Sequence, residues 1–266
     1  YFFVIEVITM AFVYAGIYHF RDRVPLWQSL TVYMFCFYCL RIHLIWQGAA
    51  LAVVLFAFRF VPARKPVPYF LLVGLAMLFH VSALIYPLYH MIAMPDDSLH
   101  PVRLDPAVMV VCVMALVLAL PTVANGLIQL KILPKSYGTY LPQRFRLDRE
   151  ETVTRLPLLL IATLLYRDLS RKEPMYRFFY VMLWAEFLLS QYGSGNSHSW
   201  RLSLYFGFFN ILSIPCLLKV IRQDPPDGVL GKGLMLCYLV VFWVYWFVLN
   251  NRGFAYPVYP FITDLL

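Results

Sequence analysis

The stretch from Pro106 to Leu130 reads PAVMVVCVMALVLALPTVANGLIQL and contains no charged residue. About 20 consecutive apolar residues are enough for a helix to cross the hydrocarbon core of a bilayer. Similar apolar runs follow one another along the 266-residue chain, which is 62% hydrophobic and only 14% charged. Soluble globular domains carry more charge than this, so the sequence predicts a membrane protein.

The apolar runs predict an all-α fold, a polytopic transmembrane helical bundle with about nine membrane segments. The candidate segments are residues 2–18, 27–42, 44–61, 68–92, 106–130, 156–167, 176–192, 201–221 and 230–249. We expect residues 1–266 to form a single integral membrane domain. Because the chain opens at Tyr1 inside an apolar run, we also expect the sequence to lack the N-terminal part of the full protein.

Basic residues outnumber acidic ones, with 22 Lys and Arg against 14 Asp and Glu. They are spread over many short loops and form no single stripe, which argues against nucleic acid as a partner and favours contact with membrane lipid. Each basic loop is expected on the cytoplasmic side of the membrane. These loops are His19–Arg23, Arg59–Lys65, Arg167–Arg177 and Lys219–Lys232.

Nine plain crossings would put the first two basic loops on one side and the last two on the other. At least one segment is therefore expected to be broken, tilted or re-entrant, and non-helical backbone at membrane depth normally lines a cavity. The candidates are residues 68–92, which carry His80 and Pro87, and the short run 156–167. The longest connector, Lys131–Arg155, is either a structured loop over a cavity or a solvated linker.

Polar side chains inside the apolar runs are the candidate functional residues. Arg41, Gln47, His80 and Arg201 lie in or at the ends of such runs. An ionisable group at membrane depth is costly, so it normally faces a cavity or a partner. The pattern indicates a protein that handles a polar or anionic substrate from within the bilayer.

The first polar stretch, Leu40–Val53, reads LRIHLIWQGAALAV. His43 and Gln47 are four residues apart, so a helix would put them on one face. Arg41 lies at the junction of two apolar runs, where it can reach an anionic headgroup. The alternative is that Arg41 extends to the membrane interface and Gln47 bonds a neighbouring helix.

The second stretch, Ala76–His90, carries His80 in mid-run with Ser82 two residues later. His80 is a candidate general base or hydrogen-bond donor to a polar ligand, and the alternative is a packing histidine. The third stretch, Gln191–Pro215, leads from a small polar loop into a helix with Arg201 and Tyr205 on one face.

The guanidinium of Arg201 suits phosphate oxygens, and its position at a helix start is unfavourable for helix stability alone. His198 in the preceding loop is a weaker candidate. Glu6 and Glu186 are isolated carboxyl groups within apolar runs, either catalytic or neutral and hydrogen-bonded. No metal-binding motif and no nucleotide-binding glycine pattern is present in the sequence, so we expect neither a metal nor another cofactor.

Four stretches taken together resemble the EpsG family of bacterial polysaccharide polymerases, part of the wider Wzy-like group. They read IWQGAALA at Ile45–Ala52, AMLFHVSALI at Ala76–Ile85, RLSLYF at Arg201–Phe206 with Ile214–Pro215, and NNRGFAYPVY at Asn250–Tyr259. Their order and spacing agree with the family over about residues 25–260. Trp46 stands where the family has an arginine before the glutamine, and the family's N-terminal Gly/Asp-Tyr segment is missing.

The resemblance implies a membrane glycosyltransferase, of GT-C-like fold, in the bacterial inner membrane. Its reaction would polymerise oligosaccharide repeat units linked to undecaprenyl diphosphate. The resemblance also implies partners, namely this lipid-linked oligosaccharide and possible chain-length regulators and export proteins.

Roles follow for the candidate residues. Arg201 and Arg41 would bind the diphosphate, and His80 would accept or orient the proton of the acceptor hydroxyl. Gln47 and Tyr205 would hold sugar hydroxyls, and Ser82 and His198 are further candidates for substrate binding.

Three other functions remain open at the level of sequence. A transporter or flippase of the same lipid-linked glycans also needs a polar cavity, although it would usually show paired internal repeats. A membrane acyltransferase would use an intramembrane histidine such as His80 on a thioester donor. A purely structural membrane subunit would need neither Arg201 nor His80.

Overall fold

A computed structural model describes residues 2–40, 44–86, 106–131, 135, 138, 147–173, 175–192, 200–221 and 227–249. Every regular element in these ranges is helical, which confirms the all-α prediction. The chain divides into two compact units: Tyr1–Met94 with Asn210–Leu266, and Pro95–Phe209. Each unit is described by itself. The single membrane domain expected from the sequence stays a prediction.

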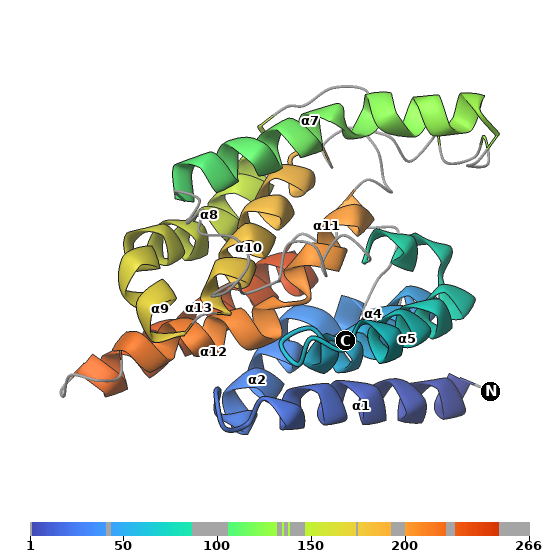
Figure 1. Cartoon of the computed structure of the whole chain (residues 1–266). Helices are drawn as coiled ribbons and strands as arrows, with labels where there is room; N and C mark the ends of the chain where they lie inside the picture. The colour runs from blue at the N-terminus through green and yellow to red at the C-terminus, as the bar shows by residue number, and fades with distance from the viewer. Residues whose placement is uncertain are drawn as a thin grey trace, which may run out of the picture. The chain divides into compact units, whose positions relative to one another are not determined.

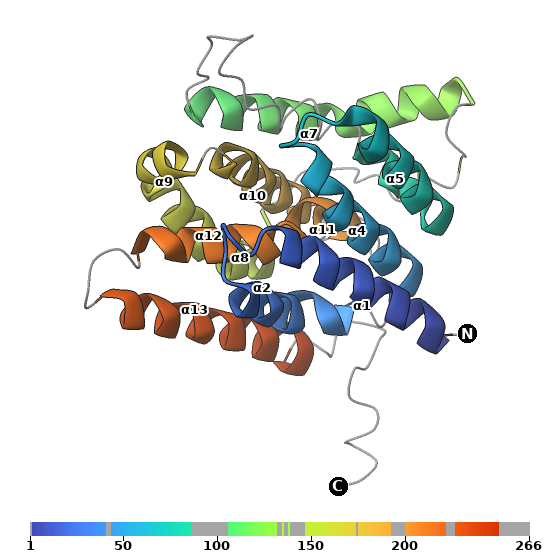
Figure 2. The same cartoon turned by 60° about the horizontal axis from the view of Figure 1, so that its bottom comes forward.

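The first unit is built on two helices that pack side by side, α1 (Phe2–His19) and α4 (Ile45–Ala57) (Figure 2). Gly16 permits the close approach, because a Cβ there would lie 3.1 Å from the backbone nitrogen of Phe56. Small residues at a helix contact serve this purpose in membrane proteins. The rings of Phe12 and Phe56 meet edge to face, 5.4 Å apart.

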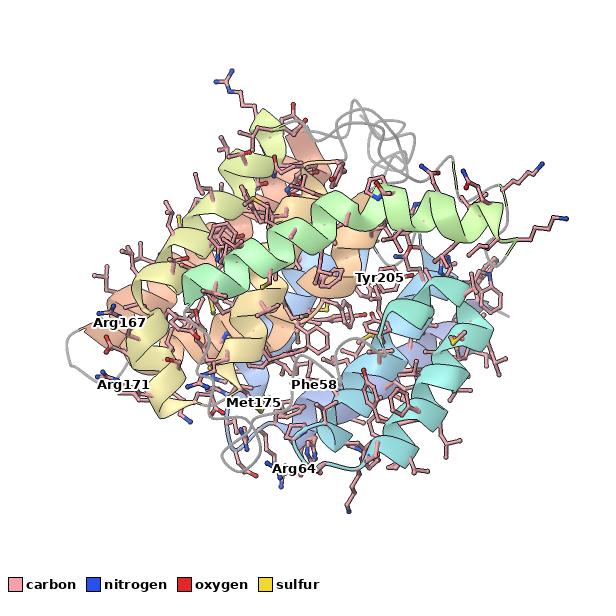
Figure 3. The ribbon with its side chains drawn as sticks, turned by 45° about the horizontal axis from the view of Figure 1, so that its top comes forward. Phe58, Arg64, Arg167, Arg171, Met175 and Tyr205 are labelled. Carbon is pink, nitrogen blue, oxygen red and sulfur yellow. The ribbon has the colours of Figure 1, made fainter. Side chains whose placement is uncertain are left out.

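The first two basic loops lie at the same end of this helix pair. The ring of Phe20, just after α1, is 5.8 Å from the ring of Phe58 in the 3-10 helix η2 (Phe58–Phe60) that ends α4. Phe58 and Arg64 mark this region in Figure 3. The Arg59 guanidinium covers the Phe56 ring at 3.8 Å, a cation–π contact. The first two basic loops thus share one end of this helix pair, while their side of the membrane stays a prediction.

The remaining helices of the first unit pack beside this pair or against one another. Helix α2 (Leu26–Tyr33) runs on into a π-helix, η1 (Met34–Tyr38), and α5 (Pro66–Phe79) returns along α4. Helix α12 (Asn210–Ile221) packs against α2 and α13 (Asp227–Trp243), and α13 ends in a second π-helix, η6 (Val244–Leu249). The first helix of this unit and the last are both apolar enough to meet lipid.

The second unit is organised around α10 (Tyr176–Ser190) (Figure 1). Packed against it are α7 (Pro106–Gln129), α8 (Arg149–Leu164), α9 (Tyr166–Lys172) and α11 (Trp200–Gly207). Two tyrosine hydroxyls fix α10 to its neighbours: Tyr176 donates to the Ala162 carbonyl at 3.0 Å and Tyr192 to the Val117 carbonyl at 3.2 Å. A buried tyrosine normally satisfies its hydroxyl in this way.

Three of the described helices are long and apolar enough to cross a membrane: α1, the Val110–Gln129 part of α7, and residues Val229–Val248. A fourth span is possible if Arg201–Gly207 and Asn210–Lys219 act together. Their outer residues suit lipid, since Phe3 is 77% exposed and Leu116 is 67% exposed. The chain is therefore a membrane protein by length and composition of its helices, while the count of nine segments stays a prediction.

Two predicted helices were wrong in their bounds. Residues 201–221 are not one helix, because α11 ends at Gly207 and α12 begins at Asn210. Asn210 favours a helix start, and its Oδ1 accepts a hydrogen bond from Ser213 Oγ at 3.0 Å. Residues 156–167 begin inside α8 and cross the break between α8 and α9 at Leu165, so this candidate broken segment is indeed broken. The predicted connector Lys131–Arg155 ends in helix from Arg149 onward.

Candidate functional site

Gln47 and His80 lie at the same end of the α4–α5 pair in the first unit. Gln47 is in the first turn of α4 and is only 3% exposed. His80 follows the last residue of α5, and the rings of Trp46 and Phe79, the preceding neighbours, lie 6.4 Å apart. The structure thus brings these two predicted site residues to one end, opposite the basic loops.

At His80 the helical backbone stops. His80 adopts an extended conformation (φ −154°, ψ 119°), and the 3-10 helix η3 (Val81–Ile85) follows it. The Tyr69 hydroxyl donates to the Tyr86 carbonyl at 2.8 Å. Because Tyr69 lies well before Phe79 in α5, the chain must double back after His80. The predicted break in residues 68–92 is confirmed, and it falls at the candidate base itself.

Ser82 lies against the imidazole of His80. A short hydrogen bond joins Nδ1 of His80 to Oγ of Ser82. A partner on one ring nitrogen selects the tautomer and therefore decides whether the other nitrogen donates or accepts. Both side chains are half-buried, so the pair is neither sealed in a core nor freely solvated. The structure adds a direct contact between His80 and Ser82. The catalytic role of His80 and the substrate-binding role of Ser82 stay predictions.

In the second unit, α11 carries Arg201 and Tyr205. Helix α11 begins at Trp200, so Arg201 is in its first turn, as the sequence predicts. Arg201 is half-buried, whereas Tyr205 is 1% exposed. Two other predicted residues, Arg41 and His198, lie outside the described residues, as does His43.

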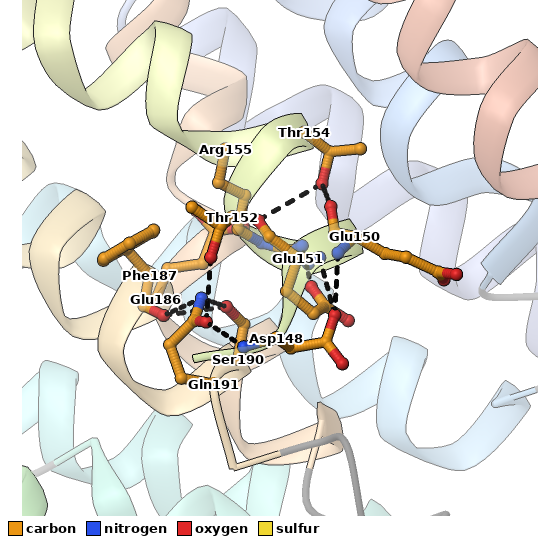
Figure 4. Close-up of polar contacts among 10 residues, drawn as sticks. All are labelled: Asp148, Glu150, Glu151, Thr152, Thr154, Arg155, Glu186, Phe187, Ser190 and Gln191. Carbon is orange, nitrogen blue, oxygen red and sulfur yellow. Dashed lines mark hydrogen bonds and ion pairs between the residues drawn. The ribbon is translucent and has the colours of Figure 1, made fainter. Parts of the chain in front are cut away.

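The main ionic cluster of the second unit, shown in Figure 4, was not predicted from the sequence. Arg155 of α8 donates from Nε to Glu186 Oε1 of α10 at 3.2 Å, and from Nη1 to Glu151 Oε2 of its own helix. The three side chains are 12–14% exposed. Charge-assisted hydrogen bonds of this kind are stronger than neutral ones and hold specific geometry.

A second set of hydrogen bonds continues from this cluster to the C-terminal end of α10. Oε1 of Gln191 accepts from the Asp148 amide at 2.9 Å and from Thr152 Oγ1 at 3.1 Å. Nε2 of Gln191 donates to the Phe187 carbonyl at 3.2 Å. Asp148 itself caps α8 by accepting from two amides of its first turn. Gln191 is fully buried, so these bonds satisfy groups that cannot reach water.

Glu151 has an unusual protonation equilibrium in this cluster. It lies in the first turn of α8, which is not among the helices long and apolar enough to cross a membrane. Burial raises the pKa of its carboxyl group to about 7, and the Arg155 guanidinium opposes this rise without cancelling it. At neutral pH the carboxyl group is therefore divided between its charged and neutral forms.

Among the residues that the structure describes, no group of three or more His, Cys, Asp or Glu side chains is arranged to hold a metal ion. The carboxylates of Glu151 and Glu186 are both engaged by Arg155. Their arrangement is that of an ionic link between helices.

A comparison with models of protein families shows which family the chain belongs to. The model of the EpsG family matches residues 1–263. The chain belongs to the EpsG family. Searches of curated proteins and of solved structures return no match. Membership in the EpsG family points to a polysaccharide-polymerase-like function and to a membrane protein of polysaccharide biosynthesis.

The EpsG match includes both regions described above, the turn at His80 and the helix with Arg201. It also includes the cluster of Arg155 and Glu186, for which the sequence held a partial signal. Glu151 and Arg155 are four residues apart and would pair on a helix. Glu186 was recognised as an isolated carboxyl group in an apolar run, but its partner lies 31 residues away along the chain.

Proposed function

We propose that this EpsG-family protein polymerises oligosaccharide repeat units linked to undecaprenyl diphosphate, in the synthesis of a surface polysaccharide or exopolysaccharide. The observation that carries the proposal is the family match over residues 1–263. Helices of membrane-spanning length support an enzyme that receives its lipid-linked donor from the bilayer. We assign it to the bacterial inner membrane as a multi-pass glycosyltransferase, working beside chain-length regulators and export proteins.

The reaction is a transfer of a glycan from its lipid diphosphate to a sugar hydroxyl. The bond between the anomeric carbon of the donor and the diphosphate oxygen breaks, and that oxygen keeps the electron pair. A new bond forms between the anomeric carbon and the acceptor oxygen, whose proton must leave. The protein therefore has to stabilise a diphosphate leaving group and to accept one proton.

Arg201, together with Arg41, is our candidate for binding the diphosphate. A guanidinium group offers planar N–H donors that match phosphate oxygens and remains charged at any physiological pH. The position of Arg201 in the first turn of α11 supports this role, because backbone amides at a helix start also favour an anion. Charge that develops on the leaving group would be stabilised without a metal ion.

His80 is our candidate for the proton acceptor, with Ser82 as the residue that orients it. If Nδ1 of His80 donates to Ser82 Oγ, then Nε2 carries the lone pair and can take the proton of the acceptor hydroxyl. The extended backbone at His80 supports a functional role, because it ends the helical part of an apolar run and non-helical backbone at membrane depth normally lines a cavity. Gln47, Tyr205 and His198 would bind hydroxyl groups of the sugars.

An extension assay tests the proposal. Purified full-length protein in lipid receives undecaprenyl-diphosphate-linked repeat units, and the products are separated by size. We expect a ladder of extended glycans from the wild type and its loss in His80→Ala and in Arg201→Ala. Absence of a ladder with the cognate substrate would overturn the polymerase, and transport of the intact lipid across a vesicle membrane would then favour a flippase.

A further inference from the structure

The last residue of α11, Gly207, lies directly against the carboxyl group of Glu186. A Cβ atom at position 207 would come within 2.6 Å of both Cδ and Oε1 of Glu186. Real Cβ atoms essentially never approach another heavy atom this closely, so any larger residue at position 207 requires movement. The contact joins α10 and α11, which pack closely along their lengths.

The carboxyl group of Glu186 is held in place by an ion pair, so it cannot easily move away from position 207. Arg155 of α8 holds Oε1 at 3.2 Å, and Arg155 is itself held by Glu151. Glu186 is 9% exposed, so breaking its bond to Arg155 would leave an unpaired charge in a site that water hardly reaches. Three helices of the second unit thus meet at one cluster: α8 supplies the guanidinium, α10 the carboxylate, and α11 the glycine that makes room for it.

A second contact holds the same end of α11. The ring of Phe209, two residues after Gly207, meets the ring of Phe178 of α10 edge to face at 5.0 Å. The end of α11 is therefore fixed to α10 at two points. Since α11 is a short helix of 8 residues, a shift of Gly207 would move the whole helix, including Arg201 in its first turn. Arg201 is six residues, or about 9 Å, from Gly207 along the helix axis.

We propose that Glu186, held by Arg155 and seated on Gly207, is a positioning residue for Arg201. It fixes the axial position of α11 and thereby the place of the guanidinium that binds the diphosphate. This inference rests on the diphosphate-binding role of Arg201 given above. A displacement of about 1 Å at a remote position can cost roughly 10²-fold in catalysis, so a small error at this contact is enough to matter.

The structure offers a direct test through Gly207→Ala, its combination with Glu186→Ala, and a matched control. Gly126→Ala in α7 of the same unit adds a methyl group where no atom lies within 4 Å, so it should bind substrate as the wild type does. The double variant removes the carboxylate that the new methyl group would strike. We expect its loss of binding affinity to be smaller than the sum of the losses in the single variants Gly207→Ala and Glu186→Ala.

The measurement is the dissociation constant of geranylgeranyl diphosphate for the purified protein in lipid nanodiscs, with thermal unfolding recorded in parallel. We expect Arg201→Ala and Gly207→Ala each to weaken binding about tenfold, the loss of one charge-assisted hydrogen bond. Glu186→Asp, which keeps the charge but withdraws it by one methylene, should weaken binding in the same direction. It also serves as the second variant if Gly207→Ala fails to fold.

The outcomes separate this inference from the function on which it rests. If Arg201→Ala weakens binding while folded Gly207→Ala and Glu186→Asp bind as the wild type does, the positioning role is overturned and the role of Arg201 stands. If Arg201→Ala binds as tightly as the wild type, the diphosphate role fails and the inference fails with it. A lowered unfolding temperature without weaker binding would mark the contact as purely structural.

Discussion

Arg155 Nε of α8 donates to Glu186 Oε1 of α10 at 3.2 Å, and this bond links two helices through side chains that are 12–14% exposed. The same guanidinium also serves Glu151, so two carboxylates depend on one cation. A buried charge is tolerated only while its partner is present. The stability of the second unit should therefore respond strongly to Arg155.

Replacement of Arg155 by Met should lower the free energy of unfolding by about 3–5 kcal/mol, because it leaves the Glu186 carboxylate and the partly ionised Glu151 buried without their cation. Denaturant unfolding of the protein in detergent, followed by tryptophan fluorescence, measures the change. The triple variant Arg155→Met, Glu151→Gln, Glu186→Gln removes all three charges and should recover much of the loss. Equal stability of the single and triple variants would contradict the account.

The raised pKa of Glu151 predicts a pH dependence of stability. The folded protein keeps a proton on this carboxyl group up to about pH 7, whereas an unfolded glutamate releases it at a pKa of about 4.3. The contribution is therefore fully present below about pH 4 and is lost as the pH rises toward and through 7. Unfolding temperatures measured across this range should show the fall, and Glu151→Gln should reduce it. A profile unchanged by Glu151→Gln would contradict the assignment.

Asp148 should stabilise the first turn of α8 through its cap. Its Oδ1 accepts from the amides of Glu150 and Glu151 at 2.9 and 3.0 Å. Asp148→Ala should cost about 0.5–2 kcal/mol and speed amide hydrogen exchange in that turn, whereas Asp148→Asn retains an acceptor and should change little. Hydrogen-exchange mass spectrometry distinguishes the two variants. Equal exchange in both would show that the cap is not the cause.

The contact between His80 and Ser82 predicts a graded loss of activity. His80→Ala should lower kcat about 10²–10⁴-fold, the usual share of a general base. Ser82→Ala removes only the partner of Nδ1 and should lower kcat about fivefold, in line with one hydrogen bond of ~1 kcal/mol. Ser82→Thr keeps the hydroxyl and should retain activity. Steady-state kinetics of the extension reaction give kcat and KM separately.

An effect of Ser82→Ala on KM alone would argue against its orienting role. So would a Ser82→Thr variant as impaired as Ser82→Ala, because the threonine still offers the oxygen that the imidazole requires.

The sequence predicted those parts of the fold that depend on local pattern. Apolar runs located α1 and α7, and the conflict among basic loops predicted a break that the structure has at His80. The break between α11 and α12 escaped prediction, because Gly207 and Asn210 are weak boundary signals inside an otherwise apolar run and no proline lies between the two helices.

Long-range pairing could not be predicted from a single chain. The partnership of Arg155 with Glu186, and the room that Gly207 leaves for it, depend on which helices pack together. Periodicity shows which face of a helix is apolar, but it does not name the neighbour. A carboxyl group inside an apolar run, such as that of Glu186, indicates that a partner exists but not which residue it is.

The shared end of the loops after α1 and after α4 predicts a pattern of cysteine labelling. Residues of the loops after α1 and after α4 share one end, so Arg23→Cys and Arg64→Cys should react with a membrane-impermeant maleimide from the same side, the cytoplasmic one. The five native cysteines would first be replaced. A protein that keeps only Cys216, which is 2% exposed, is the control and should stay unlabelled. Labelling of the two loops from opposite sides would refute the arrangement.

The most direct test of the central claim is the stoichiometry of lipid release. Wild-type protein in lipid vesicles, supplied with undecaprenyl-diphosphate-linked repeat units, should release one undecaprenyl diphosphate for each new glycosidic bond. Arg201→Ala should lose both products together. Transfer of the lipid-linked glycan across the vesicle membrane with its diphosphate bond intact, and no released carrier, would contradict the account.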